Sequence, residues 1–131
     1  MPTGTATITA IRVIDASALV AVVFSEPGAD AVAERLADAR LIAPVLLDVE
    51  FTNICLMKYR RRLVSRAGIA NAQTLRASFA IELLPVDEAR IFDLAEATGL
   101  TAYDACYLWL AQQHRAGLVT LDKQLAAAFN R

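Results

Sequence analysis

The chain has 131 residues, a length that suits one domain with a hydrophobic core. Hydrophobic residues make up 56% of it, yet no uncharged stretch approaches the roughly 18 residues of a membrane span. A net charge of −1 excludes an overall basic signature of nucleic-acid binding and leaves room only for a local basic stripe. The first ten residues, MPTGTATITA, lack the features of a secretory signal, so a cytoplasmic protein is expected.

Short apolar runs alternate with longer helical patterns along the chain. Residues 1–10 are expected to form a short leader, followed by one domain at 11–131. In chain order, the sequence predicts a strand at 11–14, helices at 16–24 and 27–39, a strand at 41–43, helices at 45–63 and 69–80, a strand at 81–86, helices at 87–98 and 101–115, a strand at 118–120 and a helix at 122–129.

Proline and glycine residues set several of these boundaries. Pro44 suits the first turn of the helix that follows it, and Pro85 confines its strand to an edge or an end. Gly99 and Gly117 suit helix C-termini. Strands separated by helices imply right-handed crossovers. The sequence therefore predicts an α/β fold, with a mainly parallel central sheet of four to five strands flanked by helices.

Three acidic residues follow strands or begin helices. In open α/β sheets, ligands lie beyond the carboxyl ends of the strands, where strand order reverses. Asp15 and Asp122 follow the first and last predicted strands, and both also suit helix N-caps. Asp104 is the single charge in TAYDACYLWLA, residues 101–111, where Thr101 suits the N-cap. A carboxylate on such an apolar face requires a hydrogen bond, an ion pair or a metal.

Glu50 is expected to lie well inside the longest predicted helix, where capping does not account for it. Its helical face carries Asn53, Ile54 and Met57. Asp48 points roughly 160° away from it, so at most one of the two acids faces inward. The more apolar stripe favours Glu50.

Four carboxylates drawn together would repel one another and raise some of their pKa values. A hard cation such as Mg²⁺ or Mn²⁺ removes this repulsion and supports hydrolysis of a phosphodiester. Ser17 has no evident base and suits a hydroxyl beside the acids rather than a nucleophile. The motifs GxxxxGKS/T, GxGxxG and GxSxG are absent from the sequence. Cys55 and Cys106 lack a CxxC partner, which indicates buried thiols.

A basic cluster, KYRRR, contains four cations and offers a surface for an RNA backbone. Its alternative interpretation is a solvated helix end whose charges complement the helix dipole. The sequence leaves both interpretations open for Lys58, Arg60, Arg61 and Arg62.

Four stretches carry a family resemblance: VIDASAL (13–19), APVLLDVEFTN (43–53), LTAYDACYLWLA (100–111) and LVTLDKQLAAA (118–128). In order and spacing they resemble the motifs of PIN-domain nucleases, and most of all the VapC toxins of toxin–antitoxin pairs. The resemblance runs from about residue 12 to the C-terminus, and the leader is longer than is usual before the first strand. It places Asp15, Glu50, Asp104 and Asp122 at the family's four acidic positions, Ser17 and Thr120 at its small hydroxyl positions, and Asn53 within the same pattern.

The resemblance implies a compact parallel sheet and dependence on Mg²⁺ or Mn²⁺. It also implies an endoribonuclease toxin that cleaves structured RNA (tRNA or rRNA), forms homodimers or larger toxin–antitoxin assemblies, and is neutralised by a VapB-type antitoxin. One alternative is a catalytically silent PIN domain that binds RNA or protein. Another, by fold analogy alone, is a phosphate-accepting receiver-like signalling domain.

Overall fold

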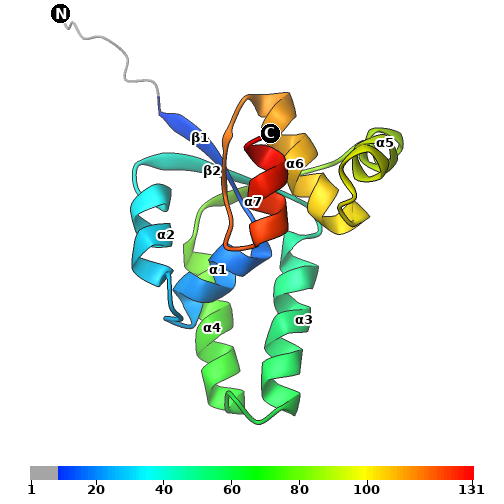
Figure 1. Cartoon of the computed structure of the whole chain (residues 1–131). Coiled ribbons are helices and arrows are strands. Elements are labelled where there is room, and N and C mark those ends of the chain that lie inside the picture. The colour runs from blue at the N-terminus through cyan, green and yellow to red at the C-terminus, as the bar shows by residue number, and fades with distance from the viewer. Residues whose placement is uncertain (1–8) are drawn as a thin grey trace, which may run out of the picture.

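A computed structural model describes residues 9–131 and shows a parallel sheet flanked by helices (Figure 1). The leader predicted at residues 1–10 lies outside the described residues, except for its last two. The described elements are β1 (Ala10–Ile14), α1 (Ala16–Val23), α2 (Ala29–Leu36), β2 (Ala39–Pro44), α3 (Leu47–Arg60), α4 (Arg66–Ser78), β3 (Ile81–Leu84), α5 (Glu88–Thr98), α6 (Ala102–His114), β4 (Gly117–Val119) and α7 (Lys123–Phe129).

The sheet has four strands in the order β3-β2-β1-β4, and every neighbouring pair is parallel. The α/β fold and a parallel sheet of four strands are thus confirmed. The chain moves from β1 through β2 to β3 in one direction and then returns to place β4 on the other side of β1. Strand order therefore reverses between β1 and β4, where a ligand site is expected in this class of sheet.

Helices cover the central strands. Helix α2 contacts β2 and β4, and α1 packs against α2. Helix α6 contacts β1, β2 and β4. Val13, Ile14 and Ile42 are almost completely buried, as expected for strands with both faces covered. Within residues 9–131, no helix is long and apolar enough to cross a membrane.

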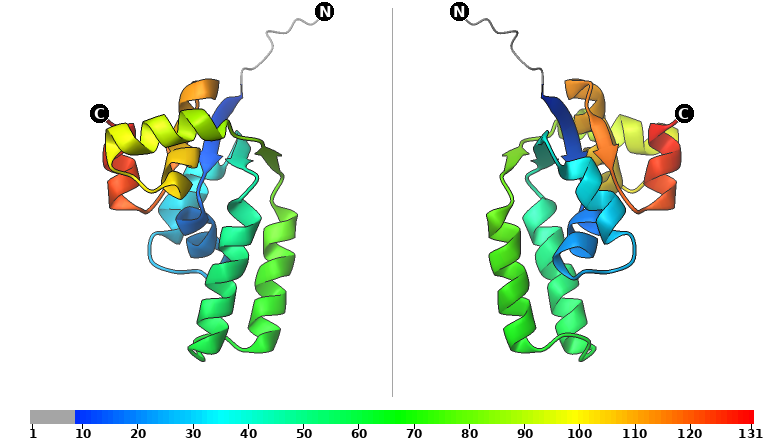
Figure 2. Two further views of the ribbon diagram at one scale, coloured as in Figure 1. Left: turned by 90° about the vertical axis from the view of Figure 1, so that its right-hand side faces the viewer. Right: turned by 90° about the vertical axis from the view of Figure 1, so that its left-hand side faces the viewer.

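Helices α3 and α4 form a hairpin that projects from the sheet (Figures 1 and 2). Helix α3 has 14 residues and is therefore about 21 Å long. It buries Leu47, Phe51 and Cys55 along one face. The connection between α3 and α4 lies at the end of the hairpin farthest from the sheet (Figure 2).

Several predicted caps are confirmed. Side chains at the three predicted N-caps, Asp15, Thr101 and Asp122, accept the backbone N–H three residues further on. Ser65 and Asp87 cap α4 and α5 in the same way, although neither cap was predicted. Gly99 ends α5 in the left-handed region, at φ 77°. Helix α6, by contrast, ends at Arg115 with φ 48°, so the predicted stop at Gly117 was wrong and that glycine begins β4.

The start of α3 also differs from the prediction. Pro44 is the last residue of β2, not part of the helix, and α3 begins at Leu47. A strand end tolerates proline because the missing N–H lies beyond the pairing with β1, which stops at Ile42. Helix α3 ends at Arg60 instead of residue 63, and α4 begins at Arg66 instead of 69 because Ser65 caps it.

Candidate functional site

Asp15 lies at the reversal of strand order. Its backbone N–H donates to the Val119 carbonyl at 3.2 Å, which joins the end of β1 to the end of β4. The residue is 5% exposed, and it is the one charged residue classed as buried among residues 9–131. A buried carboxylate requires hydrogen bonds, so its partners define the centre of the site.

Both oxygens of the Asp15 carboxylate accept hydrogen bonds. Oδ1 accepts from the Ser17 hydroxyl at 2.7 Å and from the Ala18 backbone N–H at 3.0 Å. Oδ2 accepts from the Thr120 hydroxyl at 2.5 Å. Asp15 is therefore both the N-cap of α1 and a carboxylate of fixed orientation.

The two predicted hydroxyl residues connect the loops after β1 and β4. The Ser17 hydroxyl accepts from the Leu121 backbone N–H at 2.9 Å, and the Thr120 hydroxyl accepts from the Asp122 N–H at 2.9 Å. The two hydroxyl oxygens are 3.4 Å apart. These contacts hold the loop after β4 against Asp15.

Glu50 lies in the first turn of α3, three residues after its start. Its predicted position well inside a helix was wrong, because the helix begins later than the pattern indicated. The prediction that its helical face is the apolar, inward one was also wrong: Asn53 and Met57 on that face are exposed, and α3 buries a different face. Asp48 instead pairs with Arg76 of α4 at 2.6 Å. Glu50 is the acid left for the site.

The hydroxyl of Tyr107 donates to Glu50 Oε1. Tyr107 belongs to α6, whereas Glu50 belongs to α3. Tyr107 is not among the predicted site residues. Its spacing of one helical turn from Asp104 was the signal that could have revealed it, since both side chains then share a face of α6.

Asp104 occupies the first turn of α6. Its backbone N–H donates to the Thr101 hydroxyl at 3.1 Å, so the predicted cap at Thr101 is confirmed. The reciprocal bond of a capping box, from the Thr101 N–H to the Asp104 carboxylate, is not present in the described chain. The carboxylate therefore remains available to a ligand.

Asp122 completes the acidic group. One of its carboxylate oxygens, Oδ1, accepts from the Leu125 N–H at 2.9 Å and caps α7. All four predicted acids thus lie at the N-cap or in the first turn of a helix, namely α1, α3, α6 and α7. Four helix N-termini carry partial positive charge towards the same region, which suits an anionic ligand.

The acids perturb one another. Burial is the main cause that raises the pKa of Asp15, and the negative charge of Asp122 raises it further. Burial also raises the pKa of Glu50, to which the charges of Asp104 and Asp15 add. The pKa of Asp104 is raised by burial and by Asp122 and Asp15. Hydrogen bonds from Thr120 and Tyr107 oppose these shifts at Asp15 and Glu50, respectively. Each of these three acids is therefore near enough to at least one other acid for that charge to raise its pKa.

The donor set fits a hydrated divalent cation. Within the described part of the chain, no three His, Cys, Asp or Glu side chains lie close enough to enclose an ion. Mg²⁺ does not require such a cage, because it retains several waters and binds through one or two carboxylates and substrate phosphates. The carboxylate oxygens are suitable ligands for such an ion, and its positive charge would offset their mutual repulsion.

Asn53 and the basic cluster lie away from these contacts. Asn53 is exposed, and its side-chain amide contacts Met57 Sδ at 3.8 Å. Lys58 pairs with Glu26 and lies 5.0 Å from the centre of the Phe24 ring. Arg60, Arg61 and Arg62 are exposed at the end of α3. Lys58 is therefore held by the protein, whereas the three arginines face solvent.

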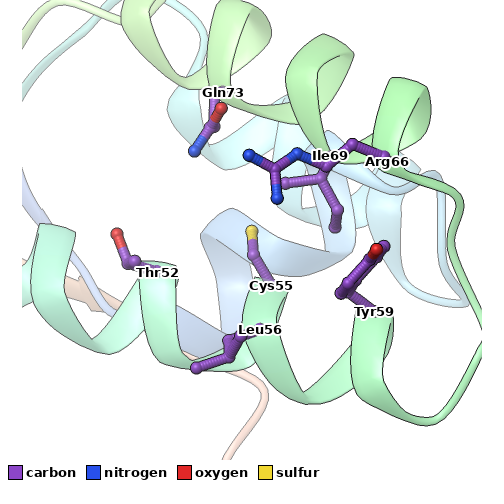
Figure 3. Close-up of a pocket in the computed structure, with 7 residues that line it drawn as sticks. All are labelled: Thr52, Cys55, Leu56, Tyr59, Arg66, Ile69 and Gln73. Atoms are coloured by element: carbon purple, nitrogen blue, oxygen red, sulfur yellow. The ribbon is translucent and has the colours of Figure 1, made fainter.

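A cavity of about 150 Å³ lies between α3 and α4 (Figure 3). The Cys55 sulfur points into it, and burial raises the pKa of this thiol. The Arg66 guanidinium lies 6.0 Å from the centre of the Tyr59 ring at one end. None of the four acids lines this cavity, so it is separate from the candidate site. Both cysteines are buried and free, as predicted.

Comparison with known protein families matches residues 12–129 to the PIN domain. Because the match spans most of the chain, the chain belongs to the PIN-domain family, whose members are generally metal-dependent nucleases. This membership removes the alternative of a receiver-like signalling domain.

Comparison with solved structures gives a similar fold in the crystal structure of PAE2754 from Pyrobaculum aerophilum. The TM-score is 0.71 at 26% sequence identity, and the match covers 91% of this chain and 84% of that chain. No curated protein sequence matches this chain. The structural likeness extends over nearly the whole described fold.

Proposed function

We propose that this chain is a metal-dependent endoribonuclease and acts as the toxin of a toxin–antitoxin pair. The observation that carries the proposal is the position of Asp15 and three further acids, Glu50, Asp104 and Asp122, at helix starts near the reversal of strand order. Burial, and then the charges of neighbouring acids, raise the pKa values of Asp15, Glu50 and Asp104. PIN-family membership supports nuclease chemistry, and the resemblance to VapC toxins supports RNA as the substrate.

In the proposed site, the four acids would hold Mg²⁺ or Mn²⁺ directly or through water. When bound, the cation activates water for attack on phosphorus and offsets negative charge on the phosphodiester. Ser17 and Thr120 fix the Asp15 carboxylate by hydrogen bonds. The four helix N-termini favour entry of the anionic RNA backbone. Asn53, one helical turn from Glu50, keeps its predicted supporting role as part of the proposal.

The same acidic site suggests how a partner would control the enzyme. An Arg side chain of a VapB-type antitoxin can bridge carboxylates bidentately and replace the positive charge of a metal. The proposal includes such an antitoxin, a homodimeric toxin and a cytoplasmic location. Co-induction of the cognate antitoxin should relieve growth arrest that the toxin causes alone.

Sequencing of RNA ends after brief induction tests the proposed function. Cells that produce the intact chain should accumulate new ends at a small set of tRNA or rRNA positions, whereas cells that produce Asp15→Asn should not. The same new RNA ends in both kinds of cell would show that cleavage does not need Asp15 and would reject the proposed site. Tight RNA binding without any cleavage by the purified intact protein would instead favour the catalytically silent PIN domain.

A further inference from the structure

Tyr107 connects the hydrophobic core to the acidic site. Its side chain is 1% exposed and belongs to the main core cluster, yet its hydroxyl donates to Glu50 Oε1. A buried phenol needs a hydrogen-bond partner, and here that partner is a carboxylate on another helix. The contact spans 57 positions of sequence and joins α6 to α3.

The position of Tyr107 links two acids through one helix. It lies three residues after Asp104, so a single turn of α6 supplies one acid and the hydrogen-bond donor for another. Helix α6 packs against three strands of the sheet, which gives this donor a rigid support. Glu50, by contrast, has a long side chain in the first turn of a helix whose far end projects from the body (Figure 2). Without a donor, its carboxylate would sample several rotamers.

We propose that Tyr107 is a positioning residue, which holds Glu50 through Oε1 and leaves Oε2 for the divalent cation. This inference rests on the proposed function, because it requires Glu50 to act at the metal site. Partners that orient metal-binding carboxylates contribute to metal affinity even though they never touch the ion. Tyr107 fits that role because its ring is fixed by packing and its hydroxyl is used by Glu50.

The variant Tyr107→Phe keeps the ring and removes the donor. We expect the Kd for Mn²⁺, measured by calorimetry on the full chain without RNA, to rise by about 10- to 100-fold. Cleavage should recover as the Mg²⁺ concentration is raised. Tyr103→Phe is the matched control, because Tyr103 lies on the same helix but is 65% exposed, and its Kd should not change. A Kd for Tyr107→Phe equal to that of the intact protein would overturn the inference.

A double-mutant cycle with Glu50→Gln separates positioning from a general effect on the fold. If Tyr107 acts through Glu50, Tyr107→Phe should have little further effect on the Kd in the Glu50→Gln background. An undiminished effect there would overturn the inference and assign Tyr107 a purely structural role. If Glu50→Gln itself leaves Mn²⁺ affinity and cleavage unchanged, the proposed role of Glu50 fails first, and the inference fails with it.

Discussion

The two ends of helix α3 carry opposite charge and are held in different ways. At its first turn, Glu50 is half-buried, accepts a hydrogen bond from Tyr107 and feels the charges of two other acids. At its last turn, Arg60 and the following Arg61 are exposed, and neither forms an ion pair within residues 9–131. About 15 Å of helix separates Glu50 from Arg60.

The difference reflects what each task requires. The proposed hydrolysis of a phosphodiester needs charges fixed relative to one another. Asp15 is accordingly buried and hydrogen-bonded, and Glu50 is half-buried and held by Tyr107. Attraction of a polyanion needs only positive charge near its path, which exposed arginines supply. Lys58 belongs to neither group, because Glu26 and Phe24 hold it. Of the four cations predicted to bind RNA, Lys58 therefore has the least support for that role.

The largest expected effect is at the acidic end. Asp15→Asn should reduce RNA cleavage by about 100-fold or more, because charge stabilisation by the metal is worth several kcal/mol. The asparagine oxygen still accepts from Ser17 and Ala18, and its amide donates to Thr120, so the fold should survive. Thermal unfolding without metal should occur at an equal or higher temperature. Asp93→Asn, an exposed acid on α5, is the control and should retain activity. Full cleavage by Asp15→Asn would show that the acidic end of α3 and its neighbours are not the catalytic site, and the contrast between the two ends of α3 would then have no functional meaning.

The pH dependence of stability should reveal the same repulsion. Because folding raises the pKa values of Asp15, Glu50 and Asp104, the folded state binds protons more tightly than the unfolded state. The metal-free protein should therefore lose stability as pH rises above about 4, the usual pKa of these carboxyl groups in an unfolded chain. Added Mg²⁺ should reduce this loss, because it offsets the repulsion and binds only the folded state. Melting curves with EDTA or Mg²⁺ measure both trends, and a stability that rises with pH in EDTA would contradict the electrostatic account.

The basic end should affect binding rather than chemistry. The double variant Arg60→Ala/Arg61→Ala should weaken RNA binding and lower the slope of log affinity against log salt by about 0.7 for each lost phosphate contact. Cleavage of bound RNA should change little. Arg90→Ala is the control, because it also removes an exposed arginine but does so on α5. Lys58→Ala should instead lower the melting temperature with little effect on affinity. If the double variant binds RNA with unchanged affinity at low salt, the cluster does not bind RNA and is only a solvated helix end.

The smallest effect is expected at Asn53, one turn beyond Glu50. Its amide contacts Met57 rather than an acid, so Asn53→Ala should reduce cleavage by about tenfold or less, within the range for outer groups at metal sites. Thr52→Ala, an exposed neighbour on α3, provides the control. A loss as large as that of Asp15→Asn would mean that Asn53 turns towards the RNA or the metal in the complex.

Local signals predicted much of this arrangement. Strand and helix alternation gave the parallel sheet, and the caps at Asp15, Thr101 and Asp122 follow from side chains that bond within their own turn. Local signals do not identify the partners in contacts between distant segments, even where spacing marks one residue, as it does for Tyr107 beside Asp104. The bond from Tyr107 to Glu50 and the pair between Lys58 and Glu26 depend on how helices pack.

The error at Pro44 has a specific physical cause. Proline suits both the first turn of a helix and a strand end without a partner for its nitrogen, so sequence alone does not distinguish them. The choice depends on where pairing with β1 stops, which is a property of the assembled sheet. The two-residue shift at the start of α3, from residue 45 to Leu47, moved Glu50 from the helix interior to its first turn.

The hydrogen bond from Thr120 to Asp15 joins residues 105 positions apart in the sequence. Such contacts form late, because the entropy of closing a long loop must be offset before they stabilise the chain. During synthesis, Asp15 leaves the ribosome long before β4 and Asp122 exist. The acidic site is thus incomplete in every shorter nascent chain. If the proposed function holds, the ribosome that makes this nuclease is exposed to a competent active site only after it has translated nearly all of the domain.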